Sequence, residues 1–298
     1  MMNTDNTNSW SFALFSAHIH RYCPALPWGE HPTLYQHWKS HHQPRPFEST
    51  LQWDMASLES LRVGPPQILA LFHLGMHAQI PQFLAEQGIQ FDLLLDRRVF
   101  VQYQTLLASL QTTKAEQGAC YRFLMSDDPQ VLLKARSAIR AGRHLLVFAD
   151  GNSGTSDLID RKVKISFLAA DLYVRKGIGL LSALLRTPIL PISHQMDGDK
   201  LQLIIAAAIG QQVDEIRDDY IQRSMQLLYD FLAEQIAEEP WRWECWGYLH
   251  VLNCYKILPH KWIDLDMADE ANIEIWLTDQ IGVFNREYFC YLFERKYF

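Results

Sequence analysis

The chain has 298 residues, of which 48% are hydrophobic, enough to bury the core of one large domain or two small ones. Its formal net charge of -7 argues against a broad nucleic-acid-binding surface and gives no sign of attraction to anionic membranes.

The cysteines and the apolar segments bear on the compartment. The five cysteines are scattered and none has CxxC spacing, so they indicate neither a zinc site nor a redox pair and fit a reducing compartment. No stretch reaches the roughly 18 to 20 uninterrupted apolar residues of a membrane span. The polar segment Met1–Ser9 lacks the basic region of a signal peptide. We therefore expect a cytoplasmic protein, with brief peripheral contact at the inner membrane as the alternative.

Residues 1–60 are expected to form an N-terminal segment of helix and loop. Mixed apolar and aromatic residues indicate a short helix over Trp10–Tyr22. His31–Pro46 is rich in His, Pro and Gln, and we expect a surface loop because no carboxylate or cysteine accompanies its histidines at metal-ligand spacing. Apolar residues at helical spacing indicate a helix within Leu51–Leu61.

Residues 61–250 show strands alternating with helices. The expected strands cover Ile68–Phe72, Phe91–Leu95, Ala119–Met125, His144–Ala149, Val163–Phe167, Ile189–Ile192 and Leu201–Ala208. The expected helices cover Ala78–Gln87, Val101–Leu110, Pro129–Ala141, Gly177–Arg186 and Asp214–Glu238. This alternation predicts a single α/β domain with a mostly parallel central sheet flanked by helices. Residues 251–298 are then an aromatic C-terminal extension whose structure the sequence does not indicate.

The first of these strands ends in a histidine. The apolar run Ile68–Phe72 stops at His73, and Gly75 and His77 follow. Open α/β sheets bind their ligands at the carboxyl ends of their strands. His73 and His77 are therefore candidate catalytic residues, near backbone N–H groups that could hold an anion or an oxyanion. A core histidine that caps a turn is the structural alternative.

Five segments follow one another in a characteristic order. They are Phe72-His73-Leu74-Gly75, Arg140–Gly151, Val163–Gly177, Thr187–Ile192 and Pro240–Trp243. Over roughly residues 60 to 250, their order and spacing resemble the lysophospholipid acyltransferase superfamily, and within it the lipid A biosynthesis acyltransferase branch. The resemblance implies acyl transfer from a thioester of an acyl or peptidyl carrier protein, or of coenzyme A, to a hydroxyl or amine. It implies no metal and no other cofactor.

One position departs from the pattern of that family. The resemblance implies a histidine as general base and, after four intervening residues, an Asp or Glu that orients it. The base would be His73, but Ala78 stands where the carboxylate is expected.

Three interpretations stay open. In the first, His73 is the general base and Asp150, at the end of the fourth strand, supports it, because neighbouring parallel strands present their carboxyl ends at one edge. In the second, positioning and an oxyanion hole carry out the catalysis with little help from a base. In the third, the chain is a non-catalytic binding protein on the same fold.

Basic residues near the expected strand ends are candidates for substrate contact. Arg97 and Arg98 follow the second strand, and Arg161 follows the loop that begins at Asp150. Their guanidinium groups could hold the phosphate of a lipid head group or of a phosphopantetheine arm. Gly151 would allow a close backbone approach. A solvated charged surface is the alternative for all three arginines.

The expected acyl acceptor follows from a second difference between this chain and the family that it resembles. Relatives of the lipid A type commonly carry an N-terminal membrane anchor and a basic surface, and this chain shows neither. We therefore expect a soluble or carrier-bound acceptor of specialised metabolism. Acylation of lipid A or a lysophospholipid at the membrane surface is the alternative.

Overall fold

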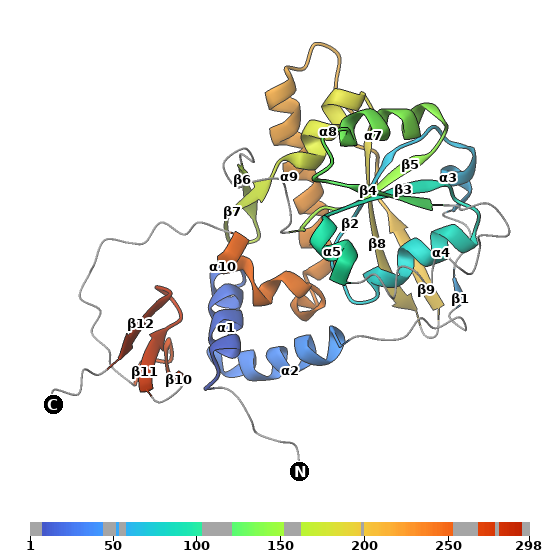
Figure 1. Ribbon diagram of the computed structural model, residues 1–298. Helices are drawn as coiled ribbons and strands as arrows, with labels where there is room; N and C mark the ends of the chain where they lie inside the picture. The colour runs from blue at the N-terminus through green and yellow to red at the C-terminus, as the bar shows by residue number, and fades with distance from the viewer. Residues whose placement is uncertain are drawn as a thin grey trace. The chain divides into compact units, whose positions relative to one another are not determined.

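The computed structural model describes residues 8–43, 52–53, 58–102, 121–151, 162–197, 200–252, 268–277 and 280–293 (Figure 1). The chain divides into two compact units. One comprises Pro44–Ile165 and Val174–Gln235, and the other Met1–Gln43, Ser166–Tyr173 and Ile236–Phe298. The three segments expected from the sequence, 1–60, 61–250 and 251–298, stay a prediction. Among the described residues, no helix has both the length and the apolar character needed to span a bilayer.

The first unit is built around a sheet whose described strands have the order β1-β9-β8-β2-β5-β3-β4. These strands are β1 (Gln52–Trp53), β2 (Ile68–Leu71), β3 (Phe91–Leu95), β4 (Tyr121–Met125), β5 (His144–Phe148), β8 (Ile189–Asp197) and β9 (Lys200–Ile205). Strands β2, β3, β4, β5 and β8 are parallel, whereas β9 is antiparallel to β8 and parallel to the short β1. The predicted fold class, α/β with a mostly parallel central sheet flanked by helices, is confirmed.

Alternating residues of β2 face two different helical layers, as expected for a strand buried on both sides. Leu69 and Leu71 join a core cluster with the apolar residues of α3 (Glu59–Val63) and α4 (Ile80–Glu86). Phe72 faces the other way and lies against Tyr229 of α9 (Arg217–Ile236). Beside α9 lies α8 (Gly177–Leu185), followed by α7 (Val131–Arg140). Figure 1 shows α4 and α7 on opposite sides of the sheet.

Two strands expected in the parallel sheet behave differently. The strand predicted at Val163–Phe167 is β6 (Lys162–Phe167), which pairs with β7 (Ala170–Arg175) in a separate two-stranded sheet, so its placement in the central sheet was wrong. Its burial alternates along the chain, as in a strand with one solvated face, and Leu168 turns the chain back with a φ of 51°. The strand predicted at Leu201–Ala208 is β9, and its connection from β8 is too short for a parallel crossover.

The other unit contains helices and a small sheet. Its elements are α1 (Trp10–Tyr22), η1 (Trp28–Glu30), α2 (His31–His41), η5 (Pro240–Arg242), η6 (Glu244–Gly247), α10 (Leu249–Leu252), β10 (Asn272–Leu277), β11 (Gln280–Asn285) and β12 (Cys290–Phe293). Helix α1 packs on this sheet through Leu14, against Ile275 and Phe284. The extension that the sequence left unassigned is thus, in its described part, an antiparallel sheet.

The loop predicted over His31–Pro46 was wrong where the structure describes it. Helix α2 begins at His31, and Pro32 is its second residue, where a missing N–H costs no hydrogen bond. Leu34 and Tyr35 are buried, so packing decides the conformation of a segment whose composition suggested a surface loop. Residues 44–46 lie outside the described residues.

Two buried histidines of this unit make its stability depend on pH. Burial lowers the pKa of His18 to about 3, although the ring donates from Nδ1 to the carbonyl of Trp246 at 2.6 Å. Burial also lowers the pKa of His31 to about 4. Its Nδ1 lies 2.7 Å from Ser16 Oγ, which in turn accepts a hydrogen bond from Arg286 at 2.8 Å. Both rings are therefore neutral in the folded protein at neutral pH.

Acid should destabilise this unit through these two groups. Each histidine binds its proton more readily when unfolded, so its stabilising contribution is complete above a pH of about 6.5 and is lost as the pH falls toward the folded pKa. Between pH 7.5 and pH 5, we expect each to lower the free energy of unfolding by about 2 kcal/mol. Urea denaturation at both pH values tests this. The His18→Asn variant keeps a donor for the carbonyl of Trp246 but has no imidazole at this position to protonate. Between the two pH values, its free energy of unfolding should therefore fall by about 2 kcal/mol less than that of wild type. An equal fall in the variant and in wild type would contradict the role of His18.

Candidate active site

The register of the sheet places His73 and Asp150 side by side. Strands β2 and β5 are parallel and pair as far as Leu71 opposite Phe148. The ladder continues when Ala149 N–H donates to the carbonyl of Leu71 at 2.7 Å. Two residues beyond the last pair come His73 and Asp150, at the carboxyl edge of the sheet. Because partners in a parallel ladder point to the same face, the two side chains meet there.

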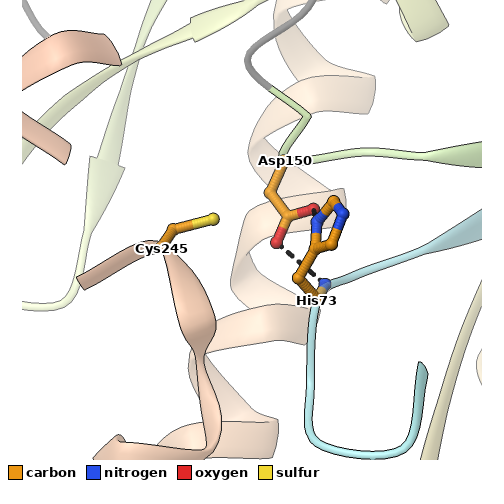
Figure 2. Close-up of side chains that lie close together, drawn as sticks. All are labelled: His73, Asp150 and Cys245. Carbon is orange, nitrogen blue, oxygen red and sulfur yellow. Dashed lines mark hydrogen bonds and ion pairs between the residues drawn. The ribbon is translucent and has the colours of Figure 1, made fainter. Parts of the chain in front are cut away.

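The carboxylate of Asp150 holds His73 at two points. Its Oδ1 lies 2.6 Å from His73 Nδ1, and its Oδ2 accepts a hydrogen bond from the backbone N–H of His73 at 3.0 Å (Figure 2). An ionised carboxylate only accepts, so the ring proton is on Nδ1 and the lone pair is on Nε2. This is the tautomer that a general base of the imidazole type requires.

The two groups differ in their exposure. The Asp150 side chain is 0% exposed, whereas that of His73 is 24% exposed. The carboxylate is therefore shielded from water, which strengthens its interaction with the ring, while the imidazole can still be reached. The ring of His73 stacks on Phe148 with their centroids 4.8 Å apart, so its plane is fixed from a second direction.

His77 lies next to this pair. Its ring stands edge-on to that of His73, with the centroids 4.8 Å apart, and also contacts Phe148 at 5.6 Å. The turn that joins the two histidines contains Gly75 at a φ of 48°, in the left-handed region where glycine carries no penalty. A role for His77 in proton transfer stays a prediction.

The predicted phosphate contacts lie elsewhere at the sheet edge or outside the described residues. Arg97 and Arg98 follow β3, the strand next to β5, and are 60% and 82% exposed. Arg97 Nε donates to Asp127 at 2.9 Å, and Arg98 Nε donates to Asp96 at 3.2 Å. A phosphate would have to compete with these carboxylates, so contact with phosphate stays a prediction.

The remaining predicted contacts follow β5. Gly151 comes directly after Asp150 and is partly exposed. Arg161 lies outside the described residues. As a substrate contact, each stays a prediction.

One residue at this sheet edge, His194, was not predicted from the sequence as part of the site. His194 is buried in β8, and its Nε2 accepts a hydrogen bond from the backbone N–H of Met76 at 3.1 Å. The sequence predicted a strand ending at Ile192, whereas β8 continues to Asp197. The missed signal was the alternation of Leu190, Ile192 and His194, which share one face of the strand.

Comparisons with known proteins give a structural likeness but no match at the level of sequence. No protein-family model matches the chain. The comparison with curated proteins gives no match. The crystal structure of the 1-acyl-sn-glycerophosphate (LPA) acyltransferase PlsC from Thermotoga maritima is similar over 76% of this chain and 97% of that chain, with a TM-score of 0.39 and 10% sequence identity. At this TM-score and sequence identity, the likeness says nothing about the function of this chain.

Proposed function

We propose that this chain is an acyltransferase that moves an acyl group from a carrier-protein or coenzyme A thioester to a hydroxyl or amine. The observation that carries the proposal is the hydrogen-bonded pair of His73 and a fully buried Asp150 at the carboxyl edge of a parallel sheet. Asp150 supplies, from a neighbouring strand, the carboxylate that Ala78 does not. Of the three interpretations of the sequence, the contact favours the one in which His73 is a supported general base.

The proposed reaction is one proton transfer coupled to acyl exchange. The acceptor O–H or N–H gives its proton to His73 Nε2 while its oxygen or nitrogen attacks the thioester carbonyl carbon. Asp150 stabilises the imidazolium that forms. The tetrahedral intermediate then expels the sulfur, which takes the proton back from Nε2. The products are the acylated acceptor and a free thiol, so His73 returns to its starting state.

The acceptor we propose is soluble or bound to a carrier. The net charge of -7 offers no general attraction to an anionic membrane surface, on which a lipid acceptor would be presented. No metal or redox cofactor enters the proposed reaction.

The test is to incubate the full chain with long-chain acyl-coenzyme A or acyl carrier protein and to follow thioester loss and product mass. Acceptors are offered in separate reactions: amines and alcohols in solution, carrier-bound hydroxyl compounds, lysophosphatidic acid, and a lipid A precursor in vesicles. Acylation of a soluble or carrier-bound acceptor supports the whole proposal. Efficient acylation of the lipids alone overturns the acceptor class, and no loss of thioester with any acceptor overturns the activity.

A carboxylate restored at position 78 should bring no gain. Because Asp150 already holds Nδ1 of His73, an Ala78→Asp variant is expected to change kcat/KM by less than about threefold, as only one acceptor can take the Nδ1 proton. Steady-state thiol release measures this. A gain of tenfold or more would mean that Asp150 does not orient the ring in the active enzyme.

A further inference from the structure

We propose that His194 is a positioning residue that fixes the turn between His73 and His77, and through it the direction of the His73 ring. The inference rests on the proposed function, since the role of His194 is defined by the base that it helps to hold.

The sheet register brings His194 to the level of the pair. Strands β2 and β8 are parallel and pair as far as Ala70 opposite Pro191. Three residues further along each strand lie His73 and His194. Asp150, His73 and His194 therefore form a row across three adjacent strands, β5, β2 and β8, at one edge of the sheet.

The turn after β2 is held from both neighbouring strands. At its start, the backbone N–H of His73 donates to Asp150 of the β5 side at 3.0 Å. Further along, the backbone N–H of Met76 donates to Nε2 of His194 in β8 at 3.1 Å. Between these two anchors lies Gly75, whose freedom at positive φ would otherwise let the turn move. Loss of either anchor would allow the backbone of His73 to shift.

The anchor requires a neutral His194. The N–H of Met76 needs an acceptor, so Nε2 of His194 carries a lone pair and the ring proton lies on Nδ1. The ionisable groups at this level of β2 and β5, among the described residues, include His73 and His77 on the β2 side and Asp150 at the end of β5. On the other side, β9 places the apolar Leu203 opposite His194. In the proposed reaction, His194 does not itself transfer a proton.

Two substitutions distinguish the role of the hydrogen-bond acceptor of His194 from that of its side-chain volume. His194→Leu keeps an apolar volume but removes the acceptor, and we expect kcat to fall about 10- to 100-fold with KM for the thioester within about threefold. His194→Gln offers a side-chain oxygen to Met76 and should keep kcat within about fivefold of wild type. Ile192→Val, on the same strand and face, is the matched control, because it removes one methyl group without touching the anchor.

Hydrogen exchange of the Met76 amide, followed by NMR, gives a readout that needs no activity. We expect exchange at least about tenfold faster in His194→Leu, and near the wild-type rate in His194→Gln and Ile192→Val. Unchanged exchange in His194→Leu would overturn the anchor, even in an active enzyme. Faster exchange with unchanged kcat would overturn the positioning role. If wild type consumes no thioester, the proposed function fails, while the exchange rates still test the anchor.

Discussion

Replacing Asp150 with asparagine is expected to slow acyl transfer by about 10⁴-fold, the order of magnitude seen when the orienting aspartate of a serine-protease triad is changed in the same way. The change preserves the size of the side chain and removes only its charge and one acceptor.

The two contacts of Asp150 decide which way the new amide points. One oxygen of the carboxylate accepts the backbone N–H of His73, a donor that cannot change its role. In the Asp150→Asn variant the amide oxygen must therefore occupy this position, and the NH₂ group then faces Nδ1 of His73. Nδ1 becomes an acceptor, and the ring proton moves to Nε2. A ring protonated there cannot take a proton from the acceptor substrate.

Nitrogen-15 NMR of the histidine rings tests this directly. Wild-type His73 should show a protonated Nδ1 and an unprotonated Nε2, and the Asp150→Asn variant should show the reverse. The matched control is Asp92→Asn, which changes another buried carboxylate in the neighbouring strand β3, where it binds Arg122 and Arg143. We expect this control to lose stability but to keep a folded-state rate within about threefold of wild type. An Asp150→Asn variant with the wild-type tautomer would contradict the argument.

The second large effect is expected at the base itself. His73→Gln should lower the rate about 10²- to 10⁴-fold, because general-base catalysis typically contributes this much. KM for the thioester should change little, since the ring acts on the acceptor proton. The measurement is thiol release under single-turnover conditions.

The control for this substitution is His144→Gln. His144 lies at the opposite end of β5 from Asp150, where its ring accepts from Gln67 N–H at 3.1 Å and bonds to the carbonyl of Leu61 at 3.0 Å. It should lose stability without loss of rate. If His73→Gln kept the wild-type rate, positioning without a base would describe the proposed reaction better.

The sequence allowed the meeting of His73 and Asp150 to be expected because both follow apolar runs of parallel strands. The carboxyl ends of parallel strands lie at the same edge of the sheet whatever the exact register. The expected contact between the two residues therefore did not depend on the exact strand boundaries. The alternation of strands and helices likewise predicted the α/β class.

Other features depended on partners that the sequence does not display. Strand β6 was predicted to belong to the parallel sheet. In the structure, the turn at Leu168 pairs it with β7 in a separate sheet. His194 fell outside a strand predicted to end at Ile192, because the polar run that follows resembles a loop. Helix α2 was predicted as a loop because its segment is rich in His, Pro and Gln. The segment is helical because tertiary packing buries one of its faces, which its composition does not indicate.

The most direct measurement compares wild type and Asp150→Asn side by side, with a mass-labelled acyl thioester and an amine or alcohol acceptor. We expect wild type to deliver the label to the acceptor, and the folded variant to do so about 10⁴-fold more slowly. Equal transfer rates for the two proteins would contradict the claim that a buried carboxylate on the next strand makes His73 a base.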